Sequence, residues 1–246
     1  MLKGSNLPLV ESVMLNKKMS HPLVYTINTN QMGHVYVVGD LHGSYSLLMQ
    51  ELKNLNFDFH NDLLVCTGDL IDRGTENLEC ISLLEQPWFL TVRGNHEEMC
   101  ITGQLDPSIK DIHRRNGGEW FYRLPKLKQL EIIEQFNELP LVIEVQLESK
   151  KIGIVHADID VHDWNIFKQD IGKGNYKIAG VSSAYSNALW GRGRIRNHSD
   201  LYDVVENIDE IYLGHTIVKE HTKIDNCHYI DVGSSFTKKL CIVKIQ

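Results

Sequence analysis

The sequence predicts an α/β protein whose β-sheet is at least partly parallel. From residue 33 onward, short apolar runs alternate with longer amphipathic stretches in the order strand, helix, strand, helix, which is the order of parallel α/β units. The 246 residues are 42% hydrophobic and 23% charged, a composition that allows one globular domain with a sizeable core. Because no linker or repeat interrupts the pattern, we expect one domain over residues 33–246, preceded by an N-terminal arm or extension over residues 1–32.

The first half of this domain is expected to contain three strand–helix pairs. Continuous apolar runs predict the strands, and apolar residues at helical spacing predict the helices between them. The helix expected first has Ser44 in a capping position, followed by Leu47, Leu48, Leu52 and Leu55. The expected strands are residues 34–40, 62–69 and 88–96, and the expected helices are residues 44–55, 76–85 and 97–103.

The second half is expected to begin with a helix over residues 126–139, which Pro140 ends. Apolar runs at 141–148 and 151–156 are close enough to form a hairpin. Residues 157–188 show no clear period, and we expect them to be rich in loops. Later strands are expected at residues 210–215, 227–233 and 240–245.

Charge, cysteine usage and hydropathy exclude several classes of protein. The net charge of -7 argues against a broad nucleic-acid surface, which would need excess lysine and arginine. The five cysteines form no C-x-x-C pair, so neither a disulfide framework nor a thiolate zinc site is expected, and reduced thiols fit the cytoplasm. No apolar stretch approaches the roughly 20 residues that cross a bilayer, and the N-terminus does not resemble a signal peptide. We therefore expect a cytoplasmic protein that does not bind membranes.

Potential metal ligands follow five of the apolar runs. In open α/β sheets, sites gather at the carboxyl ends of strands, so five strand ends that converge on one edge would bring these side chains into one crevice. The oxygen and nitrogen donors, with no thiolate, suit Mn²⁺ best, with Fe or Zn²⁺ as alternatives. The residues after the five runs are Asp40 and His42, then Asp69, then Asn95 and His96, then His156, and finally His215.

Even six of these seven residues would be too many ligands for one catalytic metal that keeps an open coordination position. They suffice for two divalent metal ions if one carboxylate bridges them, and Asp69 lies between the two sets of ligands in the sequence. Two-metal sites hold their ions about 3.5–4 Å apart and use them to activate water and to clamp a phosphoryl group.

Three motifs resemble the signatures of the phosphoprotein phosphatase family: GDLHG at 39–43, GDLIDRG at 68–74 and RGNHE at 93–97. Two later motifs, VHAD at 155–158 and GHT at 214–216, are similar to its bacteriophage lambda-type and enterobacterial serine/threonine phosphatase branch. The resemblance extends over residues 33–246, and three motifs in matching order and spacing make it specific. It implies a metallophosphoesterase-type sandwich of two mixed β-sheets flanked by helices, with the active site at the strand carboxyl ends.

The resemblance also implies a role for each site residue in the hydrolysis of phosphoserine or phosphothreonine in proteins, with no obligate regulatory subunit. His96 would protonate the leaving alkoxide, and Asp72 would orient His96. A hydroxide that bridges the metals would attack phosphorus. Three arginines would bind the phosphate oxygens: Arg73, Arg93 and Arg192. The first metal would take Asp40, His42 and Asp69, and the second would take Asp69, Asn95, His156 and His215.

Two other functions remain as alternatives. A diadenosine tetraphosphate hydrolase would use the same metals, but that branch often lacks the aspartate that is Asp72 here. A catalytically inactive metal-binding protein would usually lose a ligand or the acid, and this chain keeps them all. Where the family commonly has HADYP, this chain has HADID at 156–160, so the preference between phosphoserine and phosphotyrosine stays open. Glu97 is expected to hold the backbone. The remaining histidines, including His113 and His228, are expected to be surface or structural residues, with His162 left open because it follows His156 by six residues.

Overall fold

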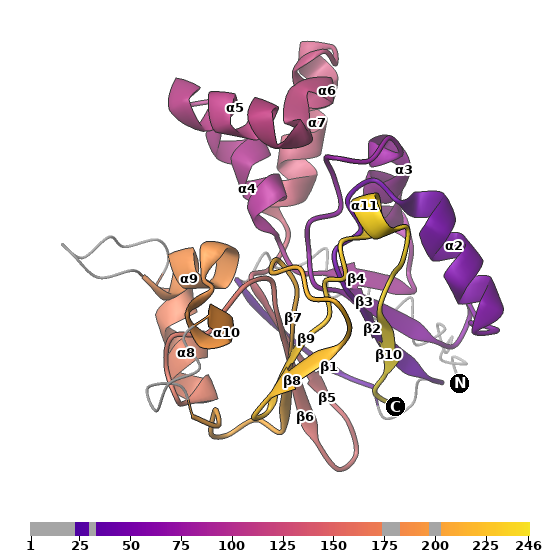
Figure 1. The fold of residues 1–246 in the computed structure, drawn as a ribbon, viewed down its shortest axis with the longest axis vertical. Coiled ribbons are helices and arrows are strands. Elements are labelled where there is room, and N and C mark those ends of the chain that lie inside the picture. Colours follow the sequence, from indigo (N-terminus) through magenta and orange to yellow (C-terminus); the bar gives the residue numbers. More distant parts are fainter. Residues whose placement is uncertain (1–22, 30–32, 174–182, 197–202) are drawn as a thin grey trace, which may run out of the picture.

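A computed structural model describes residues 23–29, 33–173, 183–196 and 203–246. Two β-sheets pack face to face, and helices cover their outer faces (Figure 1). The six-stranded sheet has the order β1-β5-β6-β7-β9-β8, and the four-stranded sheet has the order β10-β2-β3-β4. The strands are β1 (Val24–Asn28), β2 (Val35–Val38), β3 (Leu63–Cys66), β4 (Phe89–Thr91), β5 (Val142–Gln146), β6 (Lys151–Val155), β7 (Glu210–Leu213), β8 (Thr222–Ile224), β9 (Cys227–Tyr229) and β10 (Ile242–Lys244).

The helices of the described residues are short, and none of them is long and apolar enough to cross a bilayer. Those over the four-stranded sheet are α2 (Tyr45–Asn54), α3 (Asn77–Ser82) with the 3-10 turn η1 (Leu83–Glu85), α4 (Asn95–Thr102) and α7 (Lys126–Asn137). Beyond α4 lie α5 (Pro107–His113), the π-helical turn η2 (Arg114–Gly118) and α6 (Glu119–Tyr122). The later helices are α8 (Trp164–Gly172), α9 (Ala184–Trp190), α10 (Gly193–Arg196) and α11 (Ser234–Thr237).

Both sheets contain parallel and antiparallel pairs, which confirms the predicted sandwich of two mixed sheets. In the smaller sheet β2, β3 and β4 are parallel and β10 is antiparallel to β2. In the larger sheet β5 and β6 form the predicted antiparallel hairpin, while β6, β7 and β9 are parallel. The parallel portion means that the carboxyl ends of several strands point the same way.

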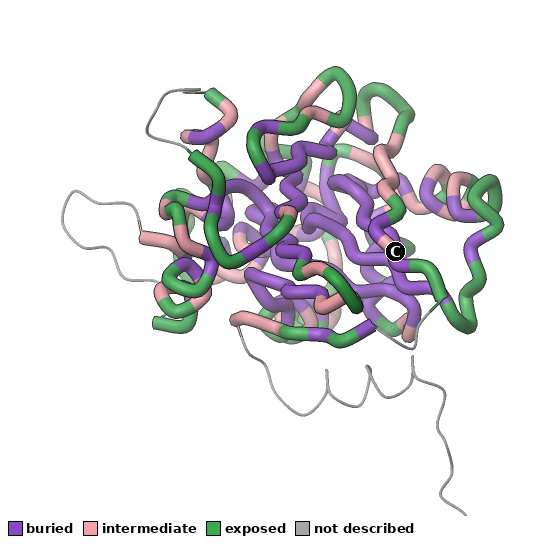
Figure 2. Tube along the Cα trace, turned by 90° about the horizontal axis from the view of Figure 1, so that it is seen from below, coloured by how far each residue is buried: buried purple, intermediate pink, exposed green. Residues whose placement is uncertain are grey.

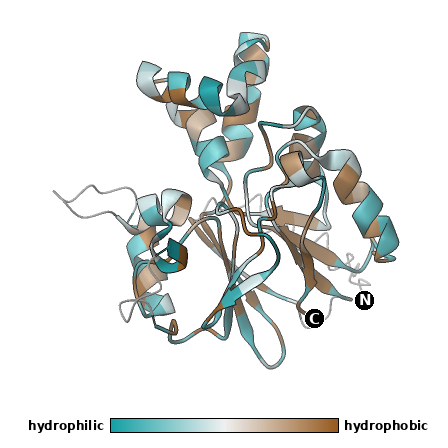
Figure 3. Ribbon diagram, viewed as in Figure 1, coloured by the Kyte–Doolittle hydropathy of each residue, from teal (hydrophilic) through white to brown (hydrophobic). Residues whose placement is uncertain are grey.

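The core has three layers because the side chains of the central strands alternate. Val35 and Val37 face the space between the sheets, whereas Tyr36 and Val38 pack under the helices. In Figure 3 the strands of the four-stranded sheet are mostly hydrophobic. The buried segments lie at the centre of the molecule with exposed segments around them (Figure 2). The loops that follow β2, β3 and β4 therefore start from strands that are buried on both faces.

The first strand corrects the predicted boundary between arm and domain. Residues 24–28 were expected in an arm over 1–32, but β1 pairs in parallel with β5 along its whole length, from Val24 with Val142 to Asn28 with Gln146. Ile27 is buried between the sheets. The strand was missed because only one of its five residues is buried, so it lacks the apolar run that marks the central strands.

Residues 157–188 contain two helices where loops were expected. The Asp163 carboxylate caps α8 by accepting hydrogen bonds from the backbone N–H groups of Asn165 and Ile166. Trp164, Phe167 and Ile171 form the buried face of α8, and they pack with α9 against the larger sheet. These three residues follow one another at helical spacing, which predicts a helix. The helix was missed because the segment that shows this spacing is short.

Deleting residues 1–18 is expected to leave fold and activity nearly unchanged. The patterned core begins later in the sequence, and the described domain begins with β1 at Val24, so the deletion removes no described contact. Melting temperature and turnover of the truncated and full-length proteins would be compared. A drop of many degrees or a large loss of turnover would show that residues 1–18 contribute to the domain.

Candidate active site

The predicted ligands converge, but they come from the strand ends of two sheets and not from one edge. Asp40, His42, Asp69 and Asn95 follow β2, β3 and β4 of the four-stranded sheet. His156 and His215 follow β6 and β7 of the six-stranded sheet. The residues from the two sheets meet where His156 Nε2 lies 2.9 Å from Asn95 Oδ1.

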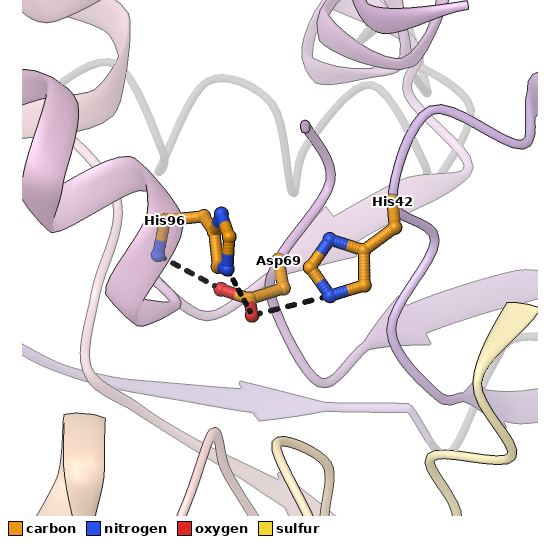
Figure 4. A group of neighbouring side chains, drawn as sticks. All are labelled: His42, Asp69 and His96. Carbon is orange, nitrogen blue, oxygen red and sulfur yellow. Dashed lines mark hydrogen bonds and ion pairs between the residues drawn. The ribbon is translucent and has the colours of Figure 1, made fainter. Parts of the chain in front are cut away.

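Asp69 lies at the centre of this cluster. Its two carboxylate oxygens face different histidines: Oδ2 lies 3.5 Å from His42 Nε2, and Oδ1 lies 3.5 Å from His156 Nε2. In Figure 4 the imidazoles of His42 and His96 flank this carboxylate. Two potential metal-binding groups result, His42 with Asp69 and His96, and Asp69 with His156 and His215, and within each group the ligand atoms lie within 4.8 Å of one another. Asp69 is common to both, as a bridging ligand would be.

The histidines are in the state that metal binding requires. Burial lowers the pKa of His42 to about 3 and that of His215 to about 2, so both imidazoles are neutral near pH 7. The Nδ1 atoms of His42 and His156 lie 2.8 Å from the carbonyl oxygens of Ile71 and Thr67, which leaves Nε2 of each ring as the ligand atom.

One buried nitrogen supports the presence of a cation directly. His215 Nε2 is buried and has no hydrogen-bond partner among the described residues. A buried polar atom without a partner is costly, and a metal ion at the Asp69 cluster would satisfy it. The donor set of the structure therefore fits a pair of divalent cations.

Asp40 lies in neither of the two groups, although it was predicted as a ligand of the first metal. Its carboxylate accepts hydrogen bonds from the Thr67 hydroxyl and from the His215 backbone N–H, both at 2.9 Å. A carboxylate has about four acceptor positions, so these bonds leave room for a cation. At Gly214 a Cβ atom would lie 1.9 Å from Asp40 Oδ1, so only glycine permits this approach.

His96 and Asp72 form the predicted pair. His96 Nδ1 lies 2.6 Å from Asp72 Oδ2, and the ring is buried beside Asp69. Burial disfavours protonation of His96, but the charge of Asp69 and the hydrogen bond to Asp72 outweigh it and raise the pKa of the imidazole. Burial of Asp72 is likewise outweighed by hydrogen bonds from His113 and His96, which lower its pKa to about 2. The pair is thus an ionised carboxylate that holds an imidazole able to carry a proton.

The three predicted arginines are in different environments. Arg73 is exposed, and its guanidinium contacts the Nε2 atoms of His42 and His96, the latter at 3.1 Å. Arg192 is half-buried and donates to the carbonyl oxygen of His215 at 3.2 Å. Both therefore border the Asp69 cluster. Arg194, which the sequence did not separate clearly from Arg192, is fully buried and donates to the carbonyl oxygen of Asp203.

Arg93 is buried and its terminal nitrogens are turned toward the helices. One of them donates to Glu98 and to the Tyr185 hydroxyl, each at 3.1 Å. The other donates to the carbonyl oxygens of Asn137 and Leu139. These bonds hold the start of α4 against α7. In this structure the guanidinium of Arg93 therefore binds structural partners and does not face the cluster.

Glu97 has the backbone role that was predicted for it. Its carboxylate accepts hydrogen bonds from the N–H groups of Asp69, Leu70 and Gly94 at 2.9–3.0 Å. It thereby ties the loop after β3 to the loop after β4.

Several site residues have strained backbones. Positive φ angles occur at His42, Asp69, Asp72, Arg73 and His215, with values from 43° to 73°. Such angles are uncommon for residues other than glycine and concentrate at functional sites. Here the strained turns follow strands and aim the side chains into the cluster.

Two functional candidates were missed in the sequence. Asp231 follows β9 and is buried, and its Oδ2 atom has no hydrogen-bond partner among the described residues. The pKa of Asp231 is raised to about 6, mainly by burial and also by the charge of Asp69. It has the same signal as the predicted ligands, a carboxylate after an apolar run. His113 is the second, and it contacts Asp72 from α5; no local pattern distinguishes it from a structural histidine.

Comparison with known proteins gives matches over most of the chain. A family model described as calcineurin-like phosphoesterase matches residues 33–220. Serine/threonine-protein phosphatase 2 of Salmonella typhimurium is 37% identical over 226 residues, which are 89% of this chain and 96% of that protein. The symmetrical bis(5'-nucleosyl)-tetraphosphatase of Pasteurella multocida is 32% identical over 133 residues, 53% of this chain and 46% of that protein. The solved structure of a protein serine/threonine phosphatase from Saccharomyces cerevisiae has a TM-score of 0.58 at 16% identity, over 93% of this chain and 78% of that one.

Proposed function

The chain belongs to the calcineurin-like phosphoesterase family, and we propose that it is a metal-dependent phosphatase of phosphoserine and phosphothreonine residues in proteins. The observation that carries this proposal is the position of Asp69 at the junction of two metal-binding groups, with the His96–Asp72 pair beside it. A phosphomonoester of a poor leaving group needs this combination of a positively charged phosphate site and an acid for the leaving oxygen.

Each ligand serves a cation pair in this proposal. One cation would be held by Asp40, His42 and Asp69, and the other by Asp69, Asn95, His156 and His215. When bound, the cations supply a water of lowered pKa as nucleophile and positive charge for the phosphate oxygens. The proposed ions are Mn²⁺, with Fe or Zn²⁺ as alternatives, because the donors are imidazole, carboxylate and amide oxygen.

The protein's own groups act on the leaving side and on the phosphate. His96 Nδ1 donates a hydrogen bond to Asp72 Oδ2, so Nε2 is the ring nitrogen that can give a proton to the leaving alkoxide. Arg73 and Arg192 border the cluster and bind the phosphate oxygens, since guanidinium groups match them in geometry. For Arg93 the same role requires that its hydrogen bonds to Glu98 and to the carbonyl oxygens of Asn137 and Leu139 break when substrate binds.

Substrates are phosphoproteins, and no obligate regulatory subunit is invoked. We place the enzyme in the cytoplasm because all five cysteines are free thiols and four of them are buried. Phosphotyrosine in proteins is a further substrate in this proposal, because the cations and arginines would act on the phosphate group that these esters share.

Hydrolysis of diadenosine tetraphosphate is the alternative, because a relative named as a symmetrical bis(5'-nucleosyl)-tetraphosphatase matches about half of this chain. The protein phosphatase matches nearly all of it, and Asp72 is in place. A side-by-side assay of a phosphoserine peptide and the dinucleotide decides between them. Preferential turnover of the dinucleotide would contradict the proposed function.

Removal of metal is expected to abolish activity. After chelation, hydrolysis of an aryl phosphate should fall to background, and added Mn²⁺ should restore it, because the proposed nucleophile depends on the cations. The melting temperature should also fall on chelation and recover with Mn²⁺, since a ligand that binds the folded state stabilises it. Full turnover in a rigorously metal-free preparation would contradict the mechanism.

A further inference from the structure

A second buried histidine contacts Asp72 from the helical segment beyond α4. His113 ends α5 and has no exposed surface. Its Nε2 atom lies 2.8 Å from Asp72 Oδ2, the same oxygen that lies 2.6 Å from His96 Nδ1. The other oxygen of Asp72 accepts a hydrogen bond of 2.7 Å from the Trp120 indole. Asp72 therefore has three side-chain partners, of which only one was expected.

The direction of these bonds follows from the ionisation of Asp72. An ionised carboxylate only accepts hydrogen bonds, so both histidines must donate to it. His113 then donates from Nε2, and its Nδ1 atom lies 3.0 Å from the Tyr122 hydroxyl oxygen. Burial raises the pKa of Tyr122, so the phenol keeps its proton.

The local backbone is shaped to admit the His113 ring. A Cβ atom at Gly118 would lie 2.2–2.5 Å from three atoms of this imidazole, so only glycine leaves room for it. The same turn leads into α6, which carries Trp120. His113 and Trp120 thus reach Asp72 from one turn of the chain, far in sequence from the strand loop that carries Asp72.

Resting on the proposed function, we propose that His113 is a positioning residue that fixes the Asp72 carboxylate, and through it the orientation of the His96 acid. Asp72 is in a strained conformation with φ of 73°, and bonds to both of its oxygens prevent rotation of the carboxylate. Without the His113 donor, the oxygen that holds His96 loses one of its two partners. His96 would then present Nε2 to the leaving group less often.

The variant His113→Phe keeps an aromatic ring and removes the donor. Turnover of a phosphoserine peptide should fall about 10- to 100-fold, the usual cost of losing such a supporting partner, with little change in KM. The loss should be smaller for 4-nitrophenyl phosphate, whose leaving group needs little protonation. His113→Gln should recover most of the activity, because its amide nitrogen reaches about as far as Nε2.

A matched control and a coupling test separate this role from simple packing. His228→Phe replaces another buried histidine, which contacts His221 and not Asp72, and it should leave the ratio of the two turnovers unchanged. In an Asp72→Asn background, His113→Phe should lower turnover little further, because the effects of substitutions at residues in contact are not additive. If His113→Phe does not fold by circular dichroism, Trp120→Phe removes the other donor and should give the same dependence on the leaving group.

Proton NMR provides a readout that does not require turnover. A downfield imidazole N–H resonance, identified by its absence in His96→Asn, should shift in His113→Phe. A folded His113→Phe protein in which this resonance is unmoved, or in which both substrates lose activity equally, would overturn the positioning role. If the resonance shifts in His113→Phe but the wild-type protein hydrolyses no phosphoester, the proposed function is overturned and the positioning of His96 by His113 stands.

Discussion

Asp69→Asn is expected to lose bound metal and phosphatase activity together. His42 and His156 approach different oxygens of this carboxylate, each at 3.5 Å, so the substitution removes a charge that serves both groups and replaces one of the two ligand oxygens with an amide nitrogen. Charge stabilisation by a catalytic metal is worth several kcal/mol, and a loss of about 4 kcal/mol corresponds to a fall of roughly 1,000-fold in turnover. Metal content and turnover of an aryl phosphate would be measured on the same preparation.

The chain offers a matched control at the other end of β3. Asp62 is also buried, and its carboxylate accepts hydrogen bonds from the backbone N–H groups of His34 and Asp58 at 2.7 and 2.9 Å. Asp62→Asn should lower the melting temperature and leave metal content unchanged. Wild-type metal content and turnover in Asp69→Asn would exclude a bridging role for this residue.

His96→Asn is expected to keep both metals and still slow turnover. Asn95 and His96 are adjacent, but the side chain of Asn95 contacts His156, whereas His96 Nδ1 contacts Asp72. General acid catalysis contributes about 10²–10⁴-fold, so turnover of a phosphoserine peptide should fall within that range. The loss should be smaller for an aryl phosphate, and Asp72→Asn should show the same pattern more weakly because it acts through His96.

The comparison of leaving groups decides what His96 does. His228→Asn, at a buried histidine distant from Asp72, serves as the control and should show no dependence on the leaving group. If His96→Asn slows both substrates equally while the metals remain bound, His96 binds phosphate and is not the acid. If the variant loses metal, His96 belongs with His42 and Asp69 as a ligand, as its Nε2 distance of 3.8 Å from Asp69 would allow.

The central strands and the site loops could be predicted because one local signal marks them. β2, β3 and β4 are buried on both faces, so they appear as continuous apolar runs, and the polar residue that ends each run marks the site. Asp231 after β9 has this signal too. The prediction that one sheet edge carries all five strand ends was wrong because strand order, which puts β6 and β7 in the other sheet, depends on pairing between distant segments.

The parts that could not be predicted depend on tertiary contacts. β1 has only one fully buried residue, and its place in the domain follows from its pairing with β5. Arg93 has the position of a phosphate ligand in its motif, but its bonds to Glu98 and Asn137 come from the packing of α4 on α7. His113 lies 41 residues from Asp72 in the sequence, and no spacing rule relates the two.

The number of metal ions per chain tests the central claim most directly. Metal-free protein would be titrated with Mn²⁺ while bound metal and hydrolysis of a phosphoserine peptide are followed together. A cluster in which Asp69 belongs to two groups predicts that activity rises until two ions are bound per chain and then stays constant. Full activity with one ion bound, and no second ion at saturation, would contradict it.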